Sequence, residues 1–160
     1  MAAAFNTFLI TFYLKYIPGS IYVNNMYFSG SDLVGFLAAG IAFKYMPITW
    51  CLKTACVIGG IGGALYLTVS NVNALLPIII CMNRAGSTMY YNICYISIPR
   101  LFPTRYVTTV YGLVNMVAHT FACFSPLVAE IKNPYPFLIF LALVALAFSV
   151  SFGVQELDKV

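Results

Sequence analysis

Long apolar runs, interrupted by asparagine, proline or glycine, dominate the pattern of this chain. A membrane-crossing helix needs about 20 mostly apolar residues. Continuous runs such as residues 137–148 argue against a β-barrel, whose strands of about 10 residues alternate apolar and polar side chains. The pattern therefore predicts an all-α integral membrane protein, with six transmembrane helices in a single domain (1–160), at residues 5–23, 30–46, 49–69, 74–98, 108–131 and 135–154.

Breaks between the helices are predicted where helix-disfavouring residues gather. They lie at Asn24-Asn25, Met46-Pro47, residues 71–73, residues 99–105 and Asn133-Pro134. The second span is the shortest of the six and contains two glycines, Gly35 and Gly40.

Composition supports a membrane protein and excludes two other classes. Hydrophobic residues make up 62% of the chain and charged residues 8%, and the mean hydropathy is +0.92. A soluble domain carries about 25% charged residues, so this chain lacks the charge to cover a water-facing surface. Disorder is excluded because it requires low hydrophobicity and high charge.

The distribution of lysine and arginine predicts the orientation, since these residues are enriched in cytoplasmic loops. With six spans, both termini share one side with most of the basic residues, namely Lys44, Lys53, Arg100, Arg105 and Lys159, whereas only Lys132 falls on the other side. We therefore expect a multi-pass protein with cytoplasmic termini, surrounded by membrane lipid, in the plasma membrane in preference to an organelle membrane. Topology accounts for the net charge of +4, so no nucleic-acid partner is expected.

Three ionisable residues fall near the middle of predicted spans, where such groups are costly and mark candidate functional sites. Lys15 shares a helix face with Thr7 and Thr11, and either faces a cavity or reaches an interface. Arg84 heads a stripe with Thr88, Tyr91, Asn92 and Tyr95; it either clamps an anionic group through paired hydrogen bonds or bonds helix-end carbonyls. His119 shares a small, polar face with Gly112 and Asn115, and either contacts substrate or protons, or packs against a neighbouring helix.

The charges of these three residues point to an anionic ligand. Asp32 and Glu130, the nearest carboxylates, are predicted near span ends. Neighbouring cations without a counter-charge are costly in a medium of low dielectric constant, and a bound anion would relieve that cost.

Other side-chain patterns point to packing. Gly59 and Gly63 form a small-xxx-small pair, which lets membrane helices approach closely. The five cysteines are expected to be buried thiols. The sequence shows no nucleophile elbow, paired carboxylates or metal-ligand spacing, so we expect no enzyme activity, no metal and no cofactor.

Residues 80–158 resemble the C-terminal half of a major facilitator transporter, most closely the organic-ion transporters. Asn83-Arg84-Ala85-Gly86 stands at the family's Gly-Lys segment, Tyr91-Asn92 at its Phe-Asn, and Tyr95 at the first tyrosine of its Tyr-x-Tyr. Arg100-Leu101-Phe102-Pro103-Thr104 stands at its Glu-Leu-Tyr-Pro-Thr loop, and Gly112, His119 and Ser125-Pro126 follow in the family's spacing.

The resemblance implies a fold, a function and a set of site residues. The fold would be two inverted three-helix repeats, about 5–70 and 74–154, with a short cytoplasmic tail at 155–160. The function would be secondary transport of a small organic ion by alternating access. The substrate-binding residues would be Lys15, Arg84, Tyr91, Asn92, Asn115 and His119, and the cytoplasmic loop motif would comprise Arg100, Pro103, Thr104 and Arg105.

Three departures from the family pattern bear on that function. Arg100 replaces the glutamate of the loop motif, and Arg105 comes two positions before the family's arginine, so the cytoplasmic charge latch is altered. His119 stands where anion carriers have arginine and cation carriers often have aspartate, so substrate charge is open, although Lys15 and Arg84 favour an anion. Lys44-Tyr45-Met46 replaces the Gly-Arg-Arg that follows the eighth helix.

The chain corresponds to six of the twelve helices of such a transporter. A partner is therefore expected, either a separate N-terminal half or a second six-helix chain. The alternative hypothesis is a non-transporting, membrane-embedded interaction subunit derived from a transporter half.

Overall fold

A computed structural model describes residues 2–16, 20–69, 76–131 and 135–153. Every regular element in these ranges is a helix, which confirms the predicted all-α class. The elements are α1 (Ala2–Tyr13), the 3-10 turn η1 (Leu14–Tyr16), α2 (Ile21–Tyr45), α3 (Ile48–Val69), α4 (Leu76–Leu101), α5 (Val107–Ala122), α6 (Ser125–Ala129) and α7 (Tyr135–Ser151).

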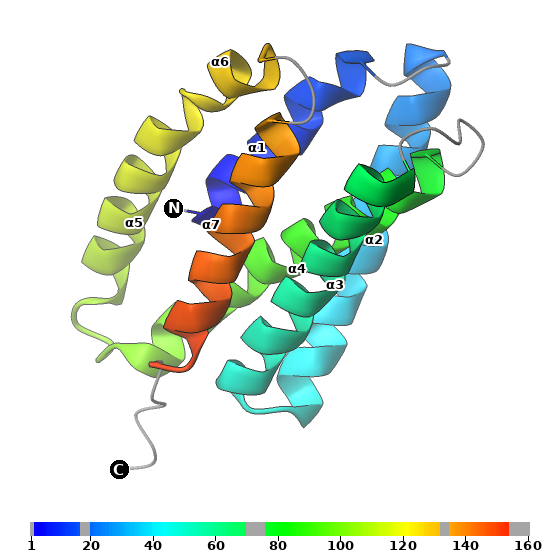
Figure 1. The fold of residues 1–160 in the computed structure, drawn as a ribbon. Helices are drawn as coiled ribbons and strands as arrows, with labels where there is room; N and C mark the ends of the chain where they lie inside the picture. The colour runs from blue at the N-terminus through cyan, green and yellow to red at the C-terminus, as the bar shows by residue number, and fades with distance from the viewer. Residues whose placement is uncertain (1, 17–19, 70–75, 132–134, 154–160) are drawn as a thin grey trace.

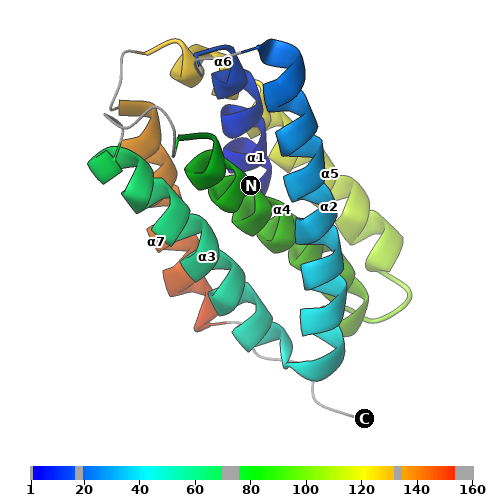
Figure 2. The same ribbon diagram turned by 90° about the vertical axis from the view of Figure 1, so that its right-hand side faces the viewer.

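The helix α4 lies at the centre of the bundle and crosses it obliquely (Figures 1 and 2). It packs against α1, α2, α3 and α5, most extensively against α3 and α2. The helix α7 covers α3 on one side and also touches α1. The α2–α3 turn, the α4–α5 connection and the end of α7 lie at one end of the bundle, and α6 lies at the other (Figure 1).

Two apolar clusters hold the bundle together. One joins α1, α2, α3, α4, α6 and α7, and in it Tyr66 stacks on Phe137 with ring centroids 3.7 Å apart. The other joins α2, α3 and α4 around Ile48 and Ile93, both fully buried. Because lipid is as apolar as these side chains, close packing holds membrane helices together in place of water exclusion.

Close approach of α3 to α4 depends on glycine. A Cβ on Gly86 would lie 2.4 Å from the Gly59 backbone nitrogen, and a Cβ on Gly62 would lie 2.7 Å from that of Asn83. Gly63 instead faces α7, where a Cβ would meet the Phe140 ring at 3.0 Å. Close packing at the Gly59 motif is confirmed, but its two glycines face different helices.

The boundary between the first two predicted spans is wrong. The first helix ends at Tyr13 and continues only as η1, whereas α2 begins at Ile21 and runs through the break predicted at Asn24-Asn25. Asparagine costs a helix less than about 0.7 kcal/mol relative to alanine, whereas proline costs about 3. The stronger breaker, Pro18-Gly19, belongs to residues 17–19, which lie outside the described ranges.

The later predicted spans agree better with the structure. Residues 49–69 match α3, and 135–154 match α7 apart from the last residues. The fourth helix runs on through Pro99 to Leu101, and the fifth span divides into α5 and α6, with Pro126 in the first turn of α6. The predicted breaks at 71–73 and 133–134, and the tail 155–160, lie outside the described residues.

Three helical segments of the described residues are long and apolar enough to cross a membrane, namely Ile21–Tyr45, Ile48–Thr68 and Val107–Ala129. Shorter apolar helices cover Ala3–Phe12 and Tyr135–Ser151. These features indicate a membrane-embedded all-α protein. Six membrane crossings and paired inverted repeats remain predictions.

Candidate functional site

Arg84 lies on α4 and pairs with Asp32 of α2. Its Nε donates to Asp32 Oδ1 at 2.7 Å, and its Nη2 donates to Asp32 Oδ2 at 2.9 Å. The two side chains are 11% and 26% exposed. Two parallel charge-assisted hydrogen bonds of this kind fix both the distance and the orientation of the partners. The pair therefore connects α2 to α4 in a defined relative position.

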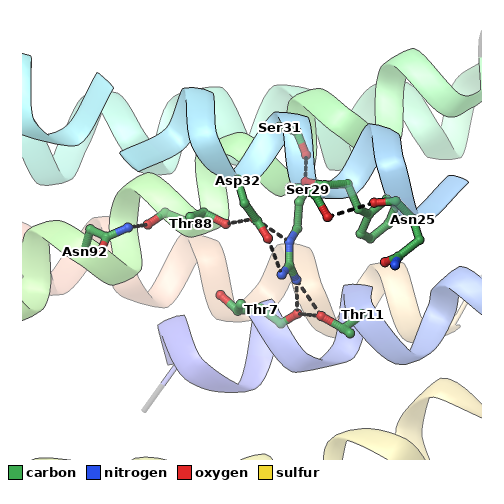
Figure 3. Close-up of polar contacts among 10 residues, drawn as sticks. Thr7, Thr11, Asn25, Ser29, Ser31, Asp32, Thr88 and Asn92 are labelled. Atoms are coloured by element: carbon green, nitrogen blue, oxygen red, sulfur yellow. Dashed lines mark hydrogen bonds and ion pairs between the residues drawn. The ribbon is translucent and has the colours of Figure 1, made fainter. Parts of the chain in front are cut away.

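Threonines from two helices complete the coordination of this ion pair (Figure 3). From α1, the Thr7 carbonyl and the Thr11 hydroxyl each accept a hydrogen bond from Arg84 Nη1 at 2.6 Å. From α4, the Thr88 hydroxyl donates to Asp32 Oδ1 at 2.6 Å. We call these five residues the ion-pair cluster. It joins α1, α2 and α4 at one point.

The ion-pair cluster overturns the argument for an anionic ligand at Arg84. That argument placed Asp32 near a span end and left Arg84 without a counter-charge. In the structure Asp32 lies near the middle of the 25-residue helix α2, facing Arg84. The misplaced start of α2 caused the error, because a helix assumed to begin at residue 30 puts Asp32 in its first turn.

A second polar group joins α4 to α5. The Tyr91 hydroxyl donates to the Tyr95 hydroxyl at 3.2 Å, and the Tyr95 hydroxyl donates to Asn115 Oδ1. The Tyr111 hydroxyl donates to the Tyr95 backbone carbonyl at 2.7 Å. We call these four residues the tyrosine cluster. It gives α4 and α5, which otherwise touch little, a hydrogen-bonded connection.

Of the other two predicted cations, His119 lies on α5 one turn after Asn115 of the tyrosine cluster, and Lys15 lies beyond the end of α1. The His119 ring meets the Phe8 ring edge-on, with centroids 5.9 Å apart, and the residue is exposed. Phe8 adjoins Thr7, so α1 contacts both His119 and Arg84. Lys15 lies in η1, past the end of α1, and is exposed. Its predicted position in mid-span is therefore wrong, because the first helix ends early.

The remaining predicted residues lie on α4 and in the connection between α4 and α5. Asn92 donates through Nδ2 to the Thr88 carbonyl one turn earlier on α4, at 2.8 Å (Figure 3). Arg100 is near the end of α4, with its guanidinium 4.1 Å from the centroid of the Phe43 ring on α2. Pro103, Thr104 and Arg105 are exposed in the α4–α5 connection, where the Pro103 carbonyl accepts a hydrogen bond from the Tyr106 amide.

Six residues of these clusters were not predicted as substrate-binding residues, namely Thr7, Thr11, Asp32, Thr88, Tyr95 and Tyr111. The predicted polar faces already included Thr7, Thr11, Thr88 and Tyr95, whereas Asp32 and Tyr111 belonged to none of them. Asp32 is the only charged residue between Lys15 and Lys44, and that isolation was the available signal. Tyr111 lies four residues before Asn115, which places both on one face of a helix. Asp32 faces Arg84 on α4, 52 positions later in the sequence, and Tyr111 contacts Tyr95 on the preceding helix, so neither partner could be assigned from the spacing within one helix.

Neither a scan against protein-family models nor a search of the curated proteins found a match to this chain. The resemblance to the major facilitator transporters therefore rests on the sequence motifs described above.

Proposed function

We propose that this chain is one six-helix half of a membrane carrier that moves a small organic ion by alternating access. In this proposal it corresponds to the C-terminal half of a major facilitator transporter of the organic-ion group. It is multi-pass, has cytoplasmic termini and resides in the plasma membrane. A separate N-terminal half, or a second copy, supplies the opposite wall of the substrate pathway.

The observation that carries the proposal is the polar connection between α4 and α5. Tyr95 and Asn115 bond each other within apolar helices, and exposed His119 lies one helical turn beyond Asn115. Polar side chains inside membrane helices are costly and typically mark substrate or ion pathways. Tyrosine hydroxyls, an amide and an imidazole together can both donate to and accept from a small polar ligand.

The ion-pair cluster has a positioning role in this proposal. Because Asp32 neutralises Arg84, the preference for an anion now rests on Lys15 and His119 alone. Tyr91, Asn92, Asn115 and His119 are the proposed substrate contacts. Lys15 keeps its proposed role as a substrate-binding cation, and Arg84 binds substrate in this proposal only when Asp32 releases it during transport.

Uptake into liposomes tests the proposal. The chain is reconstituted alone and with its native-membrane partners, and uptake of a labelled organic anion is compared with that of a labelled organic cation. Asn115→Ala and His119→Gln are expected to reduce uptake at least tenfold, about the effect of losing 1.4 kcal/mol of binding. Thr120→Ala is the matched control, because the Thr120 hydroxyl bonds only its own helix at Met116.

A non-transporting interaction subunit is the second candidate. It is favoured by the hydrogen bonds that Arg84 makes within the chain to Asp32, Thr7 and Thr11, which give this arginine a structural role without a ligand. Cross-linking in native membranes separates the candidates. A second six-helix chain as the main partner supports the carrier. A stable complex with an unrelated protein, together with no uptake of either ion, rejects it.

A further inference from the structure

An apolar hollow of about 710 Å³ lies between α5 and α7, and no residue of the ion-pair cluster lines it. We call it the α5–α7 groove. One wall is Phe121 of α5, the other is the Leu143, Leu146 and Val150 face of α7, and Phe5 and Tyr90 form the floor. The groove stays open between its two walls, because α5 packs on α1 whereas α7 packs mainly on α3.

The lining determines what kind of molecule fits. Apart from the Tyr90 hydroxyl, the side chains around the groove are hydrocarbon, so a polar headgroup would be left without hydrogen bonds inside it. The volume lies within the range of about 300–1,000 Å³ that small-molecule sites occupy. Leu143 and Val150 are separated by about 10 Å along α7, at 1.5 Å per residue. An aliphatic chain running along α7 satisfies both conditions.

The size of the wall side chains argues against a helix as the occupant. Membrane helices that pack closely present glycine, alanine or serine to each other. In this groove Phe121, Leu143 and Leu146 project from the walls, and all three are at least partly exposed. Large side chains hold two helix backbones apart but still make good contact with a thin, flexible acyl chain.

Charge at one end of the bundle indicates the headgroup. The groove-lining residue Val150 lies near the end of α7, at the same end of the bundle as the α4–α5 connection (Figure 1). The basic residues described at that end are Lys44, Lys53, Arg100 and Arg105, and the described residues there include no acidic side chain. Arg105 is exposed just before α5, the helix that forms one wall. This arrangement attracts anionic lipid headgroups.

We propose that the α5–α7 groove binds one acyl chain of an anionic phospholipid, whose headgroup lies near Arg105. This site is separate from the ion-pair and tyrosine clusters, and the proposal holds whether or not the chain transports an ion.

The test measures retained lipid. The full chain is placed in nanodiscs of equal phosphatidylcholine and phosphatidylglycerol, extracted in mild detergent, and weighed by native mass spectrometry. We expect one retained phospholipid, with phosphatidylglycerol enriched about fivefold, the preference that one basic residue near a membrane surface produces. Leu143→Trp, which fills the groove, removes the retained lipid. Arg105→Gln keeps a retained lipid but abolishes the enrichment.

Two further variants make the result decisive. Leu138→Trp is the control, because Leu138 is on α7 and 48% exposed but does not line the groove. This variant should retain lipid as the unsubstituted chain does. Val150→Trp tests the groove again at a position 64% exposed, where a larger side chain does not disturb folding. Retention by both groove variants, or no retained lipid in the unsubstituted chain, overturns the proposal. A photo-cross-linker at Phe121 that captures a polypeptide in place of lipid also overturns it.

Discussion

Arg84 of α4 and Asp32 of α2 form a two-point ion pair between residues 52 positions apart in the sequence. The pair joins helices that are not consecutive and, with Thr7 and Thr11, recruits a third helix, α1. An arginine bonded to two other helices in this way acts first as a connector of helices. Any ligand that uses Arg84 must compete with Asp32 for it.

Removing one partner of this pair should destabilise the bundle more than removing both. Asp32→Asn leaves Arg84 with an uncompensated buried charge, and loss of one partner of a buried pair costs about 3–5 kcal/mol. Asp32→Asn combined with Arg84→Gln should recover part of that loss. Unfolding in mixed micelles would measure both. If Asp32→Asn unfolds as the unsubstituted chain does, the ion pair does not hold the helices together.

The α3–α4 crossing should respond differently to alanine at its two facing glycines. Gly86→Ala places a methyl group 2.4 Å from the Gly59 backbone, and overpacking of this kind costs about 1–3 kcal/mol. Gly59→Ala meets its nearest atom at 3.7 Å and should be tolerated. Gly40→Ala, with no atom within 4 Å, is the control. Thermal denaturation of the three variants in one detergent checks the order, and equal midpoints would contradict this packing.

The tyrosine cluster should contribute a small, specific coupling between α4 and α5. Tyr95→Phe removes the hydroxyl that donates to Asn115, and an interhelical hydrogen bond in a membrane protein is worth about 0.6 kcal/mol. Asn115→Ala should cost a similar amount, and the double variant should cost no more than either single one. A double-mutant cycle of unfolding measures this coupling. Strict additivity of the two losses would show that the hydrogen bond does not form.

The proposed orientation predicts opposite labelling of two loop positions. Arg105 and Glu130 are both exposed and lie at opposite ends of the α5–α6 segment. In a Cys123→Ser background, a membrane-impermeant maleimide should label Glu130→Cys in intact cells. It should label Arg105→Cys only after permeabilisation, because basic loops remain in the cytoplasm. The reverse pattern would place the termini outside.

Boundaries show where local sequence information was insufficient. Residues 49–69 were predicted well, because this mainly apolar stretch lies between Pro47 and Asn71 in the sequence. The start of α2 was predicted nine residues too late, because Asn24-Asn25 was taken as the break. Asparagine in a helix is a modest local cost that tertiary contacts override, and Asn24 is buried in the structure.

The sequence by itself determined the helical class and the membrane environment. Both follow from local quantities, the length of apolar runs and the scarcity of charge, which require no knowledge of distant contacts. It also identified Arg84 as exceptional, because a charge within an apolar run is visible without a structure.

Only the tertiary structure decided what Arg84 does. Its counter-charge, Asp32, lies on another helix, and the energy of an ion pair depends on the distance and burial of its two charges. Neither quantity is written in the spacing of residues along one helix. The α5–α7 groove could not be predicted from the pattern either, because it depends on how two helices are placed relative to each other in the folded bundle.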